Sequence, residues 1–177
     1  IPEVVKHLPN ARFYFAGEFI GSERNIFFDQ TGQQLNQGNL RMPNTVVEEL
    51  GIQRYVSLLG LISGKRKTEV FQSAHLFVLP SYSEGFPMSI LEAMVAGLPV
   101  VTTPVGAIPE FFDQEVHGLL VSPGDPAKLT AAMVRLLQDE EKRQRISTGN
   151  RKYAEANFDI SIISNQLGIL FDEVLDQ

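Results

Sequence analysis

A short apolar run that leads through a polar turn into a helix is the feature that most constrains how this chain can fold. Residues 75–80, HLFVLP, are followed by the turn SYSEGF at 81–86 and by PMSILEAMVAG at 87–97. The pattern predicts a strand, a tight turn and a helix that ends before Gly97, because glycine commonly terminates helices. A strand joined to a helix in this way is the repeating unit of a parallel sheet.

The same alternation runs along most of the chain and predicts an α/β fold. We expect a Rossmann-like parallel sheet with helices on both faces, in one domain that spans residues 1–177. The expected strands are 11–16, 55–60, 75–80, 98–102 and 118–121, and the expected helices are 43–51, 65–73, 87–96, 107–112, 126–137, 139–157 and 160–175. Residues 1–8 look like the end of a helix already under way, so we expect the C-terminal piece of a longer protein; a trimmed natural N-terminus is the alternative. Residues 18–42 have little periodicity and are expected to form a long loop or a partly ordered insertion.

Composition excludes several classes of protein. The chain has 177 residues, of which 44% are hydrophobic, and can bury a full core. Its net charge is −6 and it has no block rich in Lys and Arg, which argues against nucleic-acid binding. It has no cysteine, so disulfides and thiol chemistry are excluded and a reducing compartment is favoured. No apolar run approaches the roughly 20 residues that span a bilayer.

Two glutamates flank the start of the helix expected at 87–96. Glu84 lies in the turn at the carboxyl end of the strand, and Glu92 lies on the helix. At about 100° per residue the core face of this helix should consist of Ile90, Leu91, Met94 and Val95. Glu92 falls outside that face, so both carboxylates can border one crevice. Acidic residues near helix starts also favour the helix dipole by about 0.3–1 kcal/mol, so a plain capping role stays open.

The turn between the two glutamates has the chemistry of an anion site. The first-turn N–H groups of a helix attract negative charge, and ligands of open α/β sheets bind at the carboxyl ends of the strands. Pro87 has no N–H, so the donors would be Met88 and Ser89, while Gly85 allows close approach of the backbone. Sugar hydroxyls could donate to the two carboxylates. The pattern therefore predicts recognition of a phosphate or diphosphate together with hydroxyl groups.

The residues around this turn resemble a known family. The stretch PSYSEGFPMSILEAM at 80–94, followed by GLPVV at 97–101, resembles the signature of the retaining nucleotide-sugar glycosyltransferases of group 1 (family 4). Gly106 with Glu110, and residues 118–121 with 123–125, extend the resemblance over nearly the whole chain. It implies one half of a GT-B fold, in which two Rossmann-like domains enclose the active site. This chain would be the C-terminal donor-binding domain, and the N-terminal acceptor domain would lie outside it.

The resemblance also implies roles for particular residues. Glu84 would be catalytic and contact the donor sugar, and Glu92 would contact the ribose hydroxyls. The other donor-binding candidates are Gly85, Phe86, Pro87, Met88, Ser89, Leu61 and Ile62, the last two beside the nucleobase. No metal and no cofactor are expected. The donor would be a nucleoside diphosphate sugar, with UDP- and GDP-sugars as first candidates, and the acceptor a saccharide, a lipid or another hydroxyl compound.

The resemblance leaves some groups unassigned. The basic residues that hold the phosphates in this family have no match here. Residues 65–67, KRK, are expected to be a solvated helix start, and His7, His75 and His117 to be structural. The helix at 160–175 crosses back to the other domain in this fold class, so its apolar face could be exposed. We expect a cytoplasmic protein, with any peripheral membrane contact made through the absent domain.

Three other functions compete with this hypothesis. An oxidoreductase-type dinucleotide domain needs G-x-G-x-x-G after its first strand, and AGEFIG at 16–21 lacks it. A glycoside hydrolase would place two carboxyl groups roughly 5–9.5 Å apart, but it has no use for a phosphate-binding helix start between them. A degenerate, non-catalytic nucleotide-sugar-binding or scaffold domain could retain both glutamates and stays open.

Overall fold

The computed structural model describes residues 1–17, 27–28, 34–35 and 43–175. The loop or insertion expected at 18–42 therefore lies mostly outside the described residues, apart from the two short strands β2 and β3. The elements follow in the order α1 (Pro2–His7), β1 (Phe13–Ala16), β2 (Phe27–Phe28), β3 (Gln34–Leu35), α2 (Pro43–Glu49), a 3-10 turn (Gln53–Tyr55), β4 (Val56–Gly60), α3 (Gly64–Ser73), β5 (Phe77–Leu79), α4 (Met88–Val95), β6 (Val100–Thr102), α5 (Ile108–Phe111), β7 (Gly118–Leu120), α6 (Pro126–Gln138), α7 (Glu140–Phe158) and α8 (Ile160–Leu175).

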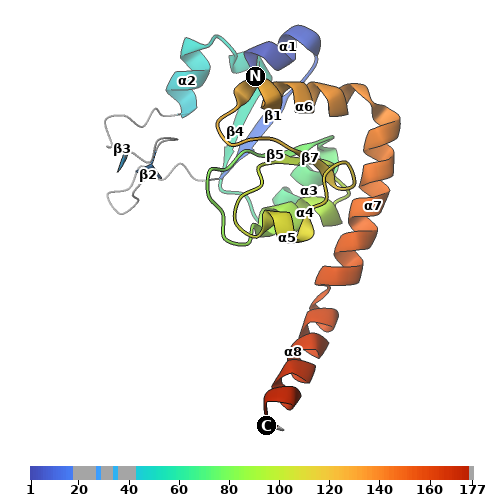
Figure 1. Ribbon diagram of the computed structural model, residues 1–177. Coiled ribbons are helices and arrows are strands. Elements are labelled where there is room, and N and C mark those ends of the chain that lie inside the picture. Colours follow the sequence, from blue (N-terminus) through green and yellow to red (C-terminus); the bar gives the residue numbers. More distant parts are fainter. Residues whose placement is uncertain (18–26, 29–33, 36–42, 176–177) are drawn as a thin grey trace.

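The strands form parallel sheets, as the alternation of elements predicts (Figure 1). β1 pairs with β4, and β5, β6 and β7 form a second, three-stranded piece; both pieces are parallel throughout. Helices connect the consecutive strands β4, β5, β6 and β7, as parallel pairing requires. The α/β, Rossmann-like fold class is confirmed. The short pair formed by β2 and β3 is antiparallel and separate.

Helices cover both faces of the sheet at β6. Val100 belongs to a cluster with residues of α4 and α5, whereas the next residue, Val101, belongs to a second cluster with residues of α6 and α7. Successive side chains of a strand point to opposite faces, so these two clusters are the two sides of the core. The larger cluster consists of Ile90, Leu91, Ala93, Met94, Leu98, Val100, Ile108, Phe111, Phe112 and Ala154.

One expectation about α4 is wrong. Ile90, Leu91 and Met94 are buried as predicted, but Val95 is 50% exposed, and Ala93 is fully buried in its place. The reason is that α4 packs against α7 as well as against β5 and β6, which rotates the buried side of the helix towards Ala93. The small Ala93 side chain fits this double contact.

A buried polar group fastens α7 to the sheet. Asn150 is fully buried and donates its amide to the carbonyls of Leu98 (2.8 Å) and His117 (2.9 Å). The Nδ1 atom of His117 lies 2.8 Å from Oδ1 of Asn150. His117 is thus structural, as expected, and the cost of burying these polar atoms is offset by their hydrogen bonds.

A second polar cluster ties α6 and α7 to the turn before β7. Arg135 of α6 donates two hydrogen bonds to Glu115, at 2.8 and 3.2 Å, and the buried ammonium of Lys142 contacts the same carboxylate. The Lys142 hydrogen bond, assisted by Arg135, holds the pKa of Glu115 below its usual value. Glu115 has a φ of 69°, an uncommon conformation for a residue other than glycine.

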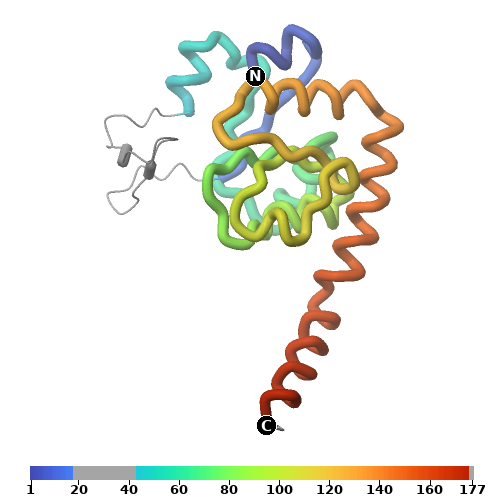
Figure 2. Tube along the Cα trace, in the orientation of Figure 1, coloured from blue at the N-terminus to red at the C-terminus, as the bar shows by residue number. Residues whose placement is uncertain are grey.

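The C-terminal helix α8 forms an extended arm. α7 runs along one side of the domain, and α8 continues away from the body to the C-terminal end (Figures 1 and 2). Most large apolar side chains of α8 are exposed: Ile160, Leu167, Ile169, Leu170, Phe171, Val174 and Leu175. Across the described part of the chain, no helix combines the length and the apolar character that crossing a membrane requires.

Candidate functional site

The predicted turn lies between the end of β5 and the start of α4, at the carboxyl edge of the sheet. Two threonines at the end of β6 hold its first residues. The Thr102 hydroxyl donates to the carbonyl of Leu79 at 2.9 Å, and the Thr103 hydroxyl donates to the carbonyl of Ser81 at 2.6 Å. Both threonines are buried. The turn therefore starts from a fixed position next to β6.

The loop after β6 supports the centre of the turn. The amide of Ala107 donates to the carbonyl of Gly85 at 3.0 Å. Gly106 has a φ of +58° and lies directly against the turn: a Cβ there would overlap the carbonyl oxygen of Glu84 and lie 2.8 Å from that of Gly85. Only glycine suits both the left-handed backbone and the close contact. This is the physical reason why a glycine is needed at position 106, where the loop after β6 contacts the turn that contains Glu84.

Glu84 is half-buried and is held within its own turn. The hydroxyl of Ser81, three residues earlier, donates to Oε1 of Glu84 at 2.6 Å. A carboxylate has two oxygens and can accept further hydrogen bonds. The side chain is thus oriented by a neighbour while keeping capacity for a hydroxyl ligand.

The start of α4 has no protein cap among the described residues. Pro87 is its N-cap residue, with φ −77° and ψ 92°, and no side chain accepts from the first turn. The Met88 side chain is 59% exposed, and the Phe86 ring, 49% exposed, rests on Phe111 with ring centroids 5.3 Å apart. Phe86 is thereby held beside the helix start. An uncapped first turn carries the partial positive charge that binds anions.

Glu92 has a partner that sequence reasoning missed. Nζ of Lys67, in α3, lies 2.5 Å from Oε1 of Glu92, and the two side chains are 33% and 40% exposed. The expectation that residues 65–67 are a solvated helix start is correct for Lys65, which is 92% exposed and pairs with Glu69 at 3.7 Å, but wrong for Lys67. The two partners are 25 residues apart, so no local pattern announces the pair.

Leu61 and Ile62 lie in the connection between β4 and α3. Leu61 is 77% exposed and Ile62 is half-buried. Gly60, with a φ of +64°, ends the strand and turns the chain into this connection. The pair between Lys67 and Glu92 links the first turns of α3 to α4, so the connection belongs to the same edge of the domain as the glutamate turn.

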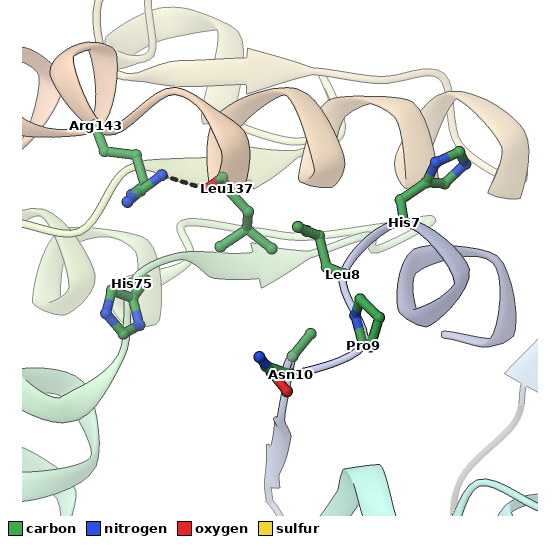
Figure 3. A pocket seen from close by; sticks show the side chains of 8 residues that line it. His7, Leu8, Pro9, Asn10, His75, Leu137 and Arg143 are labelled. Carbon is green, nitrogen blue, oxygen red and sulfur yellow. Dashed lines mark hydrogen bonds between the residues drawn. The ribbon is translucent and has the colours of Figure 1, made fainter.

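The candidate site lies apart from two surface hollows formed by the described residues. One, of about 310 Å³, lies between α1, α6 and the start of β5 (Figure 3). The other, of about 480 Å³, lies along α6. Neither is lined by Glu84 or Glu92. In the described residues, no group of three or more His, Cys, Asp or Glu side chains could hold a metal ion. The expectation that the chemistry needs no metal stays a prediction.

A parallel α/β domain with an uncapped helix start at the carboxyl edge of its sheet has the layout of the Rossmann-like class of folds, in which ligands commonly bind at that edge. The family model described as glycosyl transferases group 1 matches residues 1–153. The chain belongs to this family, as the resemblance of residues 80–101 indicates.

Curated relatives and solved structures agree with this assignment. The chain is 32% identical to a D-inositol 3-phosphate glycosyltransferase of Corynebacterium efficiens over 125 residues, 71% of this chain and 29% of that protein. It matches the structure of Anabaena Alr3699/HepE in complex with UDP with a TM-score of 0.78 and 21% identity, over 97% of this chain and 44% of that one. It also matches the C-terminal domain of the group 1 glycosyl transferase LpcC from Francisella tularensis (TM-score 0.60, 24% identity, 66% and 60% covered).

The coverage of these matches is unequal. The chain spans less than a third of the curated relative and less than half of the HepE chain. The structural neighbours are GT-B glycosyltransferases, and the match to the LpcC structure is to a C-terminal domain. The assignment of this chain as the C-terminal half of such a fold fits these matches.

Proposed function

We propose that this chain is the donor-binding domain of a retaining glycosyltransferase. It would bind a nucleoside diphosphate sugar at the turn between β5 and α4. In the full protein the bond between the anomeric carbon and the diphosphate oxygen would break, and a bond between the anomeric carbon and the oxygen of an acceptor hydroxyl would form. The diphosphate leaves with the electron pair, and the proton of the hydroxyl passes to the diphosphate or to solvent.

The observation that carries the proposal is the uncapped start of α4 with Glu84 in the turn before it. The amides of Met88 and Ser89 would receive the diphosphate, whose growing negative charge they stabilise as it departs. Gly85 and Pro87 would give the turn a backbone shape that lets the diphosphate approach closely, and the Phe86 ring would lie beside the diphosphate. Metal and cofactor have no part in this scheme.

The two glutamates would bind the hydroxyl groups of the donor. Glu84, oriented by Ser81, would accept from the sugar, and it is our candidate catalytic residue. Glu92, held by Lys67, would accept from the ribose through its other carboxylate oxygen. Leu61 and Ile62 would lie beside the base.

The proposal extends to the parts of the protein beyond this chain. Residues 1–177 would form one nucleotide-sugar-binding domain, and an N-terminal domain of the same polypeptide would bind the saccharide, lipid or other hydroxyl acceptor. UDP and GDP are the nucleotides to test first; HepE, which shares the fold, has been solved with UDP and with UDP-glucose. A cytoplasmic location belongs to the same proposal, with peripheral membrane contact through that other domain.

Calorimetric titration with UDP, GDP and UMP tests the binding step. We expect the diphosphates to bind at least about tenfold more tightly than UMP, a difference of about 1.4 kcal/mol, because UMP cannot place a β-phosphate at the α4 start. The E92Q variant should lose affinity, whereas E69Q, a change on the exposed face of α3, should not. Equal affinity for UMP and the diphosphates would contradict the proposed phosphate position.

Turnover in the full-length protein separates a transferase from a degenerate binding domain. The E84Q variant keeps the size of the side chain and should bind UDP normally while losing at least about a hundredfold in kcat. A wild-type protein that binds the nucleotide but transfers no sugar to any acceptor would favour the degenerate domain. Wild-type activity of E84Q would remove Glu84 from the reaction.

A further inference from the structure

The last part of the turn between β5 and α4 is held by side-chain packing. Phe86 lies directly before Pro87, the N-cap residue of α4, and the Pro87 side chain is buried. Among the described residues, no hydrogen bond from another segment reaches either of them. The beginning and the centre of the turn, by contrast, are held by hydrogen bonds from Thr102, Thr103 and Ala107. The direction in which the chain enters α4 therefore depends on the contacts of the Phe86 and Pro87 side chains.

The Phe86 ring belongs to a cluster of three aromatic rings. Its centroid lies 5.3 Å from that of Phe111 in α5 and 6.1 Å from that of Phe158. The rings of Phe111 and Phe158 are 6.0 Å apart and meet edge to face at 78°. Tilted and edge-to-face arrangements at these separations are the ones that aromatic pairs prefer. Each ring contacts the other two, so the Phe86 ring has a defined place although the residue is 49% exposed.

Phe158 brings a distant part of the chain to this cluster. It is the last residue of α7, and the next residue, Asp159, has the extended backbone angles φ −63° and ψ 138°. The Asp159 carboxylate accepts a hydrogen bond of 2.8 Å from the amide of Ser161 and so caps the start of α8. The end of α7, and with it the place of Phe158, is thereby fixed.

A second set of rings ties Phe158 to the interior of the domain. Its ring lies 6.0 Å from that of Tyr153, and the Tyr153 ring lies 4.4 Å from the imidazole of His117. His117 is buried and contacts the buried side chain of Asn150. Phe158 also packs against the larger core cluster. A continuous series of packed rings thus connects the interior with Phe86 at the candidate site.

We propose that Phe158 is a positioning residue for the nucleotide site. Through the Phe86 ring it sets the direction of the backbone at Pro87, and hence the direction of the Met88 and Ser89 amides. The inference rests on the proposed function, in which these amides receive the diphosphate. Because a misplacement of about 1 Å in a binding group can cost about a hundredfold, loss of the Phe158 ring weakens the site even while the domain stays folded.

Calorimetric titration of the full-length protein with UDP tests this role. F158A should weaken binding at least about tenfold, and F158L, which keeps an apolar side chain but no ring, at least about threefold. F158Y retains the ring and should bind within about twofold of the wild type.

The variant I146A is the matched control for a general loss of stability. Ile146 is also a residue of α7 and is 2% exposed, but it belongs to the cluster on the opposite face of the sheet. I146A should lose stability in urea unfolding, as F158A does, and keep its UDP affinity within about twofold. A weakening of UDP binding as large as that in F158A would assign the effect to general destabilisation and overturn the proposal.

A double-mutant cycle tests whether Phe158 acts through Phe86. With F86L present, the addition of F158L should change UDP affinity less than about twofold, because the contact between the two rings is already lost. An undiminished effect would contradict action through Phe86, and unchanged affinity in both F158A and F158L would refute the positioning role. A wild-type protein that binds neither UDP nor GDP would instead overturn the proposed function, and this inference with it.

Discussion

Substitution of Gly106 by alanine gives the sharpest test of how the glutamate turn is held. Two separate penalties apply. The left-handed backbone at φ +58° costs a residue with a Cβ about 1–2 kcal/mol. The new Cβ would also overlap the carbonyl of Glu84, which is backbone and cannot rotate away, so the loop must retreat from the turn. Retreat breaks the 3.0 Å hydrogen bond from Ala107 to Gly85, worth about 1 kcal/mol.

The variant G51A separates these two penalties. Gly51, just after α2, has a φ of +63°, nearly the same as Gly106, but a Cβ there meets nothing within 4 Å. G51A should therefore lose only the conformational part, about 1–2 kcal/mol. G106A should lose about 2–3 kcal/mol in all, since the broken hydrogen bond is added. Urea unfolding of the two variants and the wild type measures the difference directly.

Nucleotide binding provides a second readout that stability alone would not change. G106A moves the turn that carries Glu84 and should weaken UDP binding at least about tenfold, whereas G51A should leave it unchanged. Two results would refute the reasoning. One is an equal loss of stability in both variants, and the other is full UDP affinity in G106A, because the turn would then not depend on the loop after β6.

Three further substitutions test contacts elsewhere in the domain. K67M should weaken UDP binding about three- to tenfold in a calorimetric titration, with little loss of stability in urea unfolding, because a partly exposed ion pair adds only about 1 kcal/mol to folding. K65M should change neither quantity. E115Q should cost up to about 1 kcal/mol at pH 7. Because the pKa of Glu115 is lowered in the folded state, the extra stability of the wild type over E115Q is present above the unfolded pKa of about 4.3 and disappears as the pH falls through the folded pKa. Urea unfolding of both proteins from pH 7 to pH 3 measures this difference. A difference that stays constant over this range would contradict the role of Glu115. N150L should cost about 2–4 kcal/mol by thermal unfolding, because buried carbonyls and His117 lose their partner, and a loss below about 1 kcal/mol would contradict that role.

Local patterns were sufficient to predict most elements of this fold. The helix expected at 87–96 is α4 at Met88–Val95, and the helix expected at 160–175 is α8 with the same bounds. The α4 segment combines a clear apolar period with Pro87 and Gly97 at its two ends, so neighbouring residues alone determine where this helix starts and stops. The expected strands are all present, although each is shorter than its apolar run, because the ends of the runs lie in turns.

Contacts between distant segments could not be predicted in the same way. The helical periodicity of α4 predicted that Val95 is buried, because that reasoning assumed a single buried face. In the structure α7 packs against α4 as well, so the helix buries a different set of side chains. The pair between Lys67 and Glu92 joins different helices and depends on how these pack. The roles of Glu84 and Glu92 towards a ligand remain predictions for the variants proposed above.

The anchoring of α4 has a consequence for how such a protein could close around a substrate. The rear end of this helix is held by Arg151, which donates to the carbonyls of Val95 (3.2 Å) and Ala96 (3.4 Å), and by the buried amide of Asn150 on Leu98. Its front end lies at the edge where we propose that the ligand binds. A helix fixed at the back to α7 cannot swing towards a nucleotide by itself. Any movement of α4 towards a ligand must therefore carry α7 with it.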